Sequence, residues 1–350
     1  MRTKLTLIVL LSILLPSAMA KDASGQWSDT WDGEPHIVRV QWAGPKRIAV
    51  TIHAGRVVPG EQIPYTQQPG DTFDPDAKRR WVTRDGKVIG AVAGRENALL
   101  RTFDRLIGQP LDLERATDPE FVALRPATLQ PVLRPMAIYR KSRPIGLAEV
   151  GTWDWRFSME HVLYLEFAEP LPEENWLVEV ADVRPYRLET KVIRTDSAAI
   201  QTSHVGHRPD DPSKLAFLSL WLGDSGAADL SDAKAFRVHK FGDGVVFEGE
   251  VELRLKADDP QEPRQRNYNG VDIYVCDFSE VNEPGTYFVE VGGYGMSRAV
   301  VIADDVYESP ARSATRGLYH HRSGIEFGPP HTDFVRPRTM HPDDTPVVHA

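Results

Sequence analysis

Short strand-like runs dominate the sequence from Trp27 to Ile302, and they restrict the folds open to this chain more than any other feature. Each run is rich in β-branched or aromatic residues and is bounded by Gly, Pro or Asp, as in residues 36–42 (HIVRVQW) and 161–167 (HVLYLEF). Residues 47–52 and 176–180 repeat the pattern. Runs of this length and spacing are typical of antiparallel β-sandwiches. The sequence therefore predicts an all-β fold.

The clearest strand signals lie in residues 198–303, where each run is closed by turn-forming residues. This region has the size of one immunoglobulin-like sandwich, and we predict such a domain over residues 198–303. Its expected strands are residues 214–222, 235–240, 244–255, 270–276, 286–291 and 298–302.

Residues 21–197 are predicted to form a first β-sandwich-like domain with an irregular insertion near residues 71–135. Residues 139–142 and 161–171 give this domain a fibronectin-like or immunoglobulin-like character. Within the insertion, the Arg84-Asp85-Gly86 sequence predicts a hairpin turn. A short helix is expected near residues 97–107.

A longer helix is predicted close to the end, over residues 304–324. Ser309 is expected at the N-cap with Pro310 at the first helical position, and Gly324 is expected in the left-handed conformation after the last turn. One face of the helix recurs at three- and four-residue steps and is largely apolar, and it consists of Ala311, Ala314, Leu318 and Arg322. No second periodic helix follows. We therefore expect the partner of this face to belong to a larger protein.

The first twenty residues have the layout of a secretory signal peptide, in which Arg2 and Lys4 precede the apolar run of residues 5–15. We expect cleavage after Ala20 and a secreted or periplasmic protein. The apolar run is too short to span a membrane, and no later segment reaches the roughly 18 apolar residues that a membrane helix needs. We therefore expect no membrane partner.

The chain is acidic, with 41 Lys and Arg residues against 50 Asp and Glu residues and a formal net charge of −9. This balance argues against nucleic acid as a partner, because binding to phosphates requires an excess of basic residues. Cys276 is the only cysteine, so no internal disulfide can form. We expect Cys276 to be buried and chemically inert.

Several short motifs follow one another between residues 203 and 297. They are residues 203–209 (SHVGHRP), Pro212, residues 214–216 (KLA), 245–249 (VVFEG), 277–279 (DFS) and 284–287 (PGTY), and the pair Gly295 and Ser297. In this order and spacing, they resemble the immunoglobulin-like domain that precedes the catalytic barrel in family 9 glycoside hydrolases, the cellulase family. His207 departs from the pattern, because the family usually has a tyrosine there.

Residues 305–307 and 314–324 resemble the linker and first helix of the six-hairpin (α/α) barrel of that family, although Ser323 stands where an Arg-Cys-Gly sequence is common. The resemblance implies two β-sandwich domains followed, at residues 304–350, by a linker and one helix of a truncated (α/α)6 barrel. The implied parent activity is hydrolysis of β-1,4-glucan or a related polysaccharide by an inverting mechanism.

An inverting glycoside hydrolase needs a general acid and a general base on opposite sides of the scissile bond. In the resembled family, the base comes from an Asp-Ala-Gly-Asp sequence early in the barrel, and this chain contains no such sequence. We therefore assign no catalytic residue, no metal and no cofactor, and we expect the chain as given to be inactive. Polysaccharide would be bound by the missing catalytic domain.

Other constellations have simpler interpretations. Residues 223–226 (GDSG) resemble the nucleophile sequence of trypsin-like proteases, but matching His and Asp segments are missing, and a turn is favoured. The Asp258-Asp259 and Asp343-Asp344 pairs lack the loop of an EF-hand. The late histidines lack the spacing of a metal site and are expected to be solvated or packed, namely His320, His321, His331, His341 and His349.

Trp153 and Trp155 are the candidate carbohydrate-binding residues. In a strand, side chains two residues apart face the same side, and a pair of indoles would suit the C–H face of a sugar ring. With eight tryptophans in the chain, packing of this pair in a hydrophobic core is the favoured alternative.

Two functions remain open. In the first, this chain is the non-catalytic N-terminal region of a secreted family 9-like enzyme, whose immunoglobulin-like domain supports the barrel. In the second, the chain is a stand-alone secreted β-sandwich protein that binds carbohydrate or another surface without catalysis.

Overall fold

The structure is a computed structural model that describes residues 31–73, 80–93, 98–126, 131–172, 175–189, 196–260, 265, 268–339, 341 and 343. Strands are the main regular structure, and two short α-helices are present among the described residues. The predicted all-β fold is confirmed. The predicted signal peptide lies outside the described residues.

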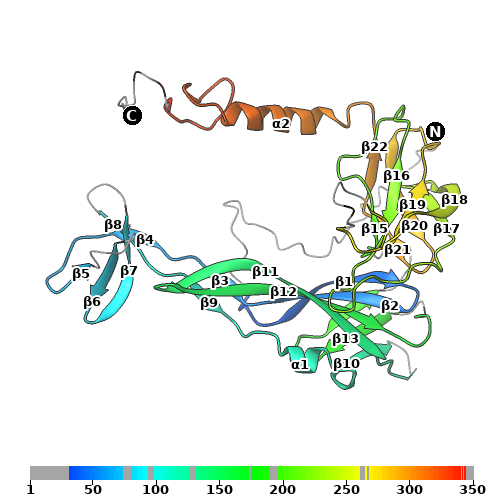
Figure 1. Cartoon of the computed structure of the whole chain (residues 1–350), viewed down its shortest axis with the longest axis horizontal. Helices are drawn as coiled ribbons and strands as arrows, with labels where there is room; N and C mark the ends of the chain where they lie inside the picture. The colour runs from blue at the N-terminus through cyan, green and yellow to red at the C-terminus, as the bar shows by residue number, and fades with distance from the viewer. Residues whose placement is uncertain are drawn as a thin grey trace, which may run out of the picture.

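The first β unit is a sandwich of two antiparallel sheets (Figure 1). The four-stranded sheet has the order β1 (His36–Gly44), β2 (Arg47–Ala54), β12 (Asp154–Glu166) and β11 (Ala137–Gly151). The three-stranded sheet contains β10 (Val122–Pro126), β13 (Asn175–Val180) and β14 (Tyr186–Glu189). Alternate residues of each strand fill the core between the sheets, for example Ile52, Leu163, Leu165 and Val178, all fully buried.

A long insertion between β2 and β10 extends along the β11–β12 ribbon. It begins with β3 (Arg56–Val58), which pairs with β9 (Arg105–Ile107), and it ends with α1 (Leu113–Ala116) and the 3-10 helix η2 (Pro119–Phe121). Between β3 and β9, a separate five-stranded sheet forms at the far end of the ribbon (Figure 1). Its strands are β4 (Gln62–Pro64), β8 (Leu99–Arg101), β7 (Lys87–Ala93), β6 (Trp81–Arg84) and β5 (Thr72–Phe73).

The predicted hairpin in this insertion is confirmed, because Arg84 pairs with Lys87 around Asp85 and Gly86, whose φ angles of 51° and 74° fit a tight hairpin turn. The short helix expected near residues 97–107 is wrong. Residues 99–101 form β8 and residues 105–107 form β9, and Leu100 is buried in the five-stranded sheet opposite Ile63. Pairing with strands about 40 residues earlier outweighs the local helical pattern.

The second β unit is an eight-stranded sheet folded around its own core. β18 (Gly244–Leu255) joins its two halves, since residues 244–250 pair with β17 (Ala235–Lys240) and residues 251–255 pair with β19 (Ile273–Asp277). The remaining strands are β15 (Ile200–Gln201), β16 (Leu215–Leu218), β20 (Gly285–Val291), β21 (Gly295–Met296) and β22 (Val300–Ile302). Cys276 is fully buried in this core, as predicted, and burial raises the pKa of its thiol to about 12.

The two β units share a core. Ala43, Ala49 and Tyr164 of the first unit pack with the buried residues of the second unit. The backbone continues the contact, because Trp42 N–H donates to Asp196 O at 3.1 Å and Ala198 N–H donates to Trp42 O at 2.7 Å. The units are therefore packed against each other through both side chains and backbone.

Helix α2 (Glu308–His320) extends from the second β unit (Figure 1). The predicted helix is present, but its predicted ends are wrong. Tyr307 is the N-cap, without a side-chain cap bond, and Pro310 lies inside the first turn, where its missing N–H is tolerated. The helix ends at His320, so Gly324, although at a φ of 76°, lies beyond the last turn.

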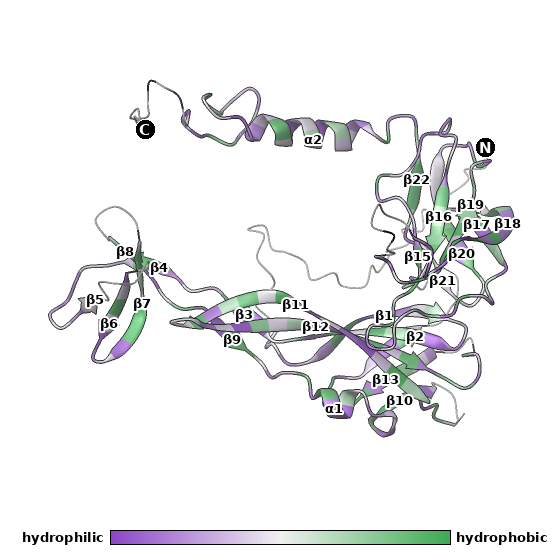
Figure 2. Ribbon diagram, viewed as in Figure 1, coloured by the Kyte–Doolittle hydropathy of each residue, from purple (hydrophilic) through white to green (hydrophobic). Residues whose placement is uncertain are grey.

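None of the residues of α2 is buried, and Leu318 is 72% exposed. Figure 2 shows mixed polar and apolar residues along α2, in contrast to the hydrophobic segments of β13 and β16. After the helix, Phe327 packs beneath the Arg336 guanidinium, 4.0 Å from its ring centroid, and against Tyr319. In the described part of the chain, no helix is both long and apolar enough to cross a membrane.

Candidate functional site

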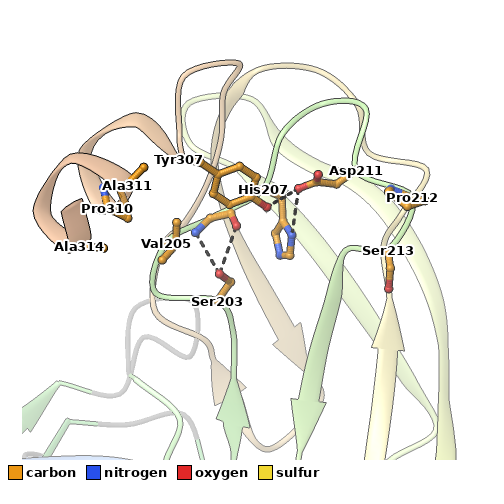
Figure 3. Close-up of a pocket in the computed structure, with 11 residues that line it drawn as sticks. Ser203, Val205, His207, Asp211, Pro212, Ser213, Tyr307, Pro310, Ala311 and Ala314 are labelled. Carbon is orange, nitrogen blue, oxygen red and sulfur yellow. Dashed lines mark hydrogen bonds and ion pairs between the residues drawn. The ribbon is translucent and has the colours of Figure 1, made fainter. Parts of the chain in front are cut away.

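A hollow of about 730 Å³ lies where α2 leaves the second β unit (Figure 3). Residues from the loop before β16 form one wall, including Val205, His207 and Asp211. The start of α2 forms the other wall, including Tyr307 and Ala311. The hollow is therefore built from the same segments that carry the motifs at residues 203–209 and 305–307.

The loop wall is held tightly on β22. His207 N–H donates to Val301 O at 2.8 Å, and Ala303 N–H donates to His207 O at 3.0 Å. Gly206 precedes this pairing with a φ of 101°, and a Cβ at that position would lie 2.3 Å from Val301 O. Only glycine fits this approach, because any side chain would push the loop off β22.

The start of α2 is tied to the loop by one strong hydrogen bond. Tyr307 donates its hydroxyl proton to Asp211 Oδ2 at 2.6 Å, and the backbone N–H of Arg208 donates to the same oxygen at 2.7 Å. These two donors hold the pKa of Asp211 below its ordinary value, and the bond to Asp211 raises the pKa of Tyr307. Figure 3 shows the Tyr307 hydroxyl pointing at Asp211.

His207 sits beneath this pair without completing a catalytic arrangement. Its Nδ1 is 3.8 Å from Asp211 Oδ2, beyond hydrogen-bond distance, and its ring packs edge-on against Phe278. Burial lowers the pKa of His207, which favours the neutral imidazole. The hydroxyl of Tyr307 is engaged with a carboxylate and stays protonated. The geometry therefore supports anchoring of the helix rather than bond cleavage.

Lys214 also belongs to this region, and its burial could not be recognised from the sequence. Its side chain is completely buried, and its Nζ donates to Asp211 O at 2.9 Å, Ser279 O at 2.9 Å and Asn282 Oδ1 at 3.0 Å. All three protons of the ammonium group are thus used. Lys214 fastens the loop of the hollow to the turn after β19.

The structure places Trp153 and Trp155 at the far end of the β11–β12 ribbon. The expectation that both lie in one strand is wrong, because Trp153 occupies the turn between Gly151 and Asp154, with a φ of 63°. The alternative of core packing is also contradicted, because Trp153 is 74% and Trp155 is 38% exposed. Both indoles are accessible to a ligand.

The other sequence candidates have structural roles. Residues 223–226 form a turn, as expected, and this turn docks on the edge strand β11: Asp224 N–H donates to Arg140 O at 3.1 Å, and Arg140 N–H donates to Asp224 Oδ1 at 2.8 Å. His320 and His331 pack around Tyr319. His349 and Asp344 lie outside the described residues. Among the described residues, no three His, Cys, Asp or Glu side chains are grouped as a metal site would require.

Comparison with known proteins shows that the second β unit is similar to a known family of domains. Residues 195–296 match the family described as "Cellulase N-terminal ig-like domain". The resemblance predicted from the sequence is confirmed. This match covers the second β unit up to β21 and ends before α2.

A curated relative is Endoglucanase D of Acetivibrio thermocellus, which is 46% identical over 52 residues. The match covers 15% of this chain and 8% of that protein, so this chain corresponds to a small part of the relative.

Two solved structures are also similar to part of this chain. One is a family 9 endoglucanase, J30, at 27% identity and a TM-score of 0.29, with 37% of this chain and 21% of that chain covered. Another is a metagenome-derived family 9 endoglucanase at 27% identity and a TM-score of 0.31, with 41% and 24% covered.

Proposed function

We propose that this chain is the non-catalytic N-terminal region of an exported, family 9-like glycoside hydrolase, and that its immunoglobulin-like unit supports an α-helical catalytic domain that begins with α2. The proposal rests on one observation, the exposure of α2. The helix is anchored at its start by Tyr307 and Asp211, yet none of its residues is buried. A helix with exposed apolar positions and no buried residue needs a partner, because packing supplies most of the stability of helices this short.

The proposed partner is the remainder of a helical barrel, and the match of residues 195–296 supports this choice. The parent reaction would be inverting hydrolysis of a β-1,4-glucan or a related polysaccharide, with both carboxylates supplied by the helical domain. The contribution of this chain is mechanical: the loop on β22, the buried Lys214 and the Tyr307–Asp211 bond fix the direction in which α2 leaves the β unit.

The test is to express the gene from its start codon to its natural stop codon and to measure the mass and the activity of the product. We expect a product longer than 350 residues that hydrolyses soluble β-glucan, whereas the 350-residue chain alone gives no turnover. In the longer product, Leu318→Asp should lower the melting temperature, while the charge change Arg316→Glu, at an exposed position on the polar side of α2, serves as the matched control.

Two results would overturn the proposal. A natural product that stops at Ala350 would leave α2 without the proposed partner and would favour the stand-alone binding protein. Turnover of β-glucan by the 350-residue chain would contradict the assignment of catalysis to another domain.

A further inference from the structure

Four large apolar side chains are exposed together on the far half of the β11–β12 ribbon. They are Leu147 (51% exposed), Trp153 (74%), Trp155 (38%) and Phe157 (50%), and we name this set the aromatic strip. Leu147 and Phe157 are directly paired across the ribbon, so their side chains lie on the same face. Trp155 is two residues from Phe157 along β12 and shares that face.

Part of the opposite face of the ribbon is buried against the insertion. Ala148 is fully buried and Ser158 is 5% exposed. A Cβ at Gly146 would lie 3.1 Å from Val57 of β3, which shows how closely the insertion packs on that side. Leu147, Trp153 and Phe157 are each half or more exposed, so burial in a core does not explain their size.

The backbone of Trp153 gives a second, independent indication. A φ of 63° is strained for a bulky residue, and the turn position it occupies is one where glycine is ordinarily favoured. Burial does not offset this strain, because the indole is the most exposed of the four side chains. Strain held without a packing gain is characteristic of residues that serve binding.

The chemistry of the strip selects a neutral, flat ligand. Asp154 and Arg156 alternate with Trp155 and Phe157 along β12, so their side chains lie on the other face of the ribbon, and Glu149, which pairs with Trp155, is only 7% exposed. The strip therefore exposes little charge, and neither a strongly acidic nor a strongly basic partner is favoured. A protein partner would need roughly 1,000 Å² of interface or more, and a ribbon two strands wide offers little flat area. Trp155 and Phe157 are about 6.5 Å apart along the strand, far enough for each ring to stack on a different sugar unit.

We propose that the aromatic strip binds an extended β-glucan chain by stacking of Trp153, Trp155 and Phe157 on successive sugar rings. The choice of β-glucan among neutral polysaccharides rests on the proposed function.

The experiment is native affinity electrophoresis of the 350-residue chain, without its signal peptide, in gels that contain barley β-glucan or hydroxyethyl cellulose. We expect retardation of the wild-type chain, and a rise in the dissociation constant of at least tenfold for Trp153→Ala, Trp155→Ala and Phe157→Ala. Phe241→Ala is the matched control, because Phe241 is an aromatic residue of the second β unit that is 68% exposed. Its retardation should equal that of the wild type.

Trp153→Gly keeps the result interpretable if the alanine variants fold poorly, because glycine adopts a positive φ without strain. This variant should melt at or above the wild-type temperature and lose retardation. Lack of retardation of the wild-type chain, or equal binding by the strip variants, would overturn the proposal. It would also be overturned if sedimentation showed a wild-type dimer that these substitutions dissociate, because a second copy would then be the occupant. None of these results depends on turnover, so the proposed enzyme function stands or falls separately.

Discussion

Gly223 offers the sharpest test of how the two β units are joined. Its φ is 85°, and a Cβ at this position would lie 2.1 Å from Arg140 O on β11. The contact cannot relax by a side-chain movement, because both partners are backbone. Gly223→Ala should therefore push the turn of residues 223–226 away from the edge of β11.

The expected cost has two parts. Alanine in the left-handed region costs about 1 kcal/mol relative to glycine. Displacement of the turn breaks the two hydrogen bonds between Asp224 and Arg140, at 3.1 and 2.8 Å, each worth about 1 kcal/mol net. The free energy of unfolding should therefore fall by about 3 kcal/mol for Gly223→Ala.

The control is Gly242→Ala, because Gly242 has a similar φ of 93° but no atom within 4 Å of the position of a new Cβ. This variant should lose only about 1 kcal/mol, the strain component. Urea titrations followed by tryptophan fluorescence measure both values, and hydrogen exchange of the Arg140 amide should accelerate only in Gly223→Ala. Equal losses of stability in the two variants would refute the idea that the turn docks the units together.

Three further predictions follow from individual contacts. Trp153→Gly should raise the free energy of unfolding by about 1 kcal/mol, because glycine relieves the strained φ, and a loss of stability in urea would contradict this account. The Arg84 guanidinium holds the pKa of Asp71 far below its ordinary value, so this pair stabilises the fold above about pH 4 and loses that effect as the pH falls further. Acid titration by circular dichroism should show this loss in the wild type and a weaker pH dependence in Asp71→Asn. Tyr307→Phe removes the hydrogen bond to Asp211, and hydrogen exchange should accelerate at the start of α2 but not in β18.

Two strands of the second β unit could be predicted to the residue from local signals. Residues 235–240 and 244–255 were expected as strands and are β17 and β18, because alternation and flanking turn residues define both ends. The GDSG turn was predicted for the same reason. Its contact with Arg140 could not be, since the two segments are 84 residues apart.

The predictions of helices and helix ends were wrong where distant strand partners or backbone conformation decide the secondary structure. The expected helix near residues 97–107 gave way to β8 and β9, whose partners β4 and β3 lie far upstream. The expected cap at Ser309 failed because Pro310 fits anywhere in the first turn, so it does not fix where α2 begins.

Only part of the aromatic strip could be predicted from the sequence. Trp153 and Trp155 were identified from their type, but their shared face was inferred from a strand that Trp153 does not join. Phe157 continues the two-residue spacing from Trp155 and was overlooked. Leu147 had no sequence signal, because only the register of the ribbon places it opposite Phe157.

The β12 strand explains why the site and the helix anchor belong to one mechanical body. Leu163 and Leu165 are buried in the core of the first β unit, while Tyr164 between them is buried in the core of the second unit. The same strand, paired with β11 along its whole length, carries Trp155 and Phe157 at its other end. A ligand on the aromatic strip is therefore held by a continuous hydrogen-bonded ribbon that is packed into the unit from which α2 departs. If the strip binds β-glucan, the polysaccharide is held at a fixed place relative to α2. A variant can shorten the ribbon between the strip and Tyr164 by deleting a matched pair of residues from each strand. This variant should still bind β-glucan but should change how a catalytic domain beyond α2 uses the bound chain.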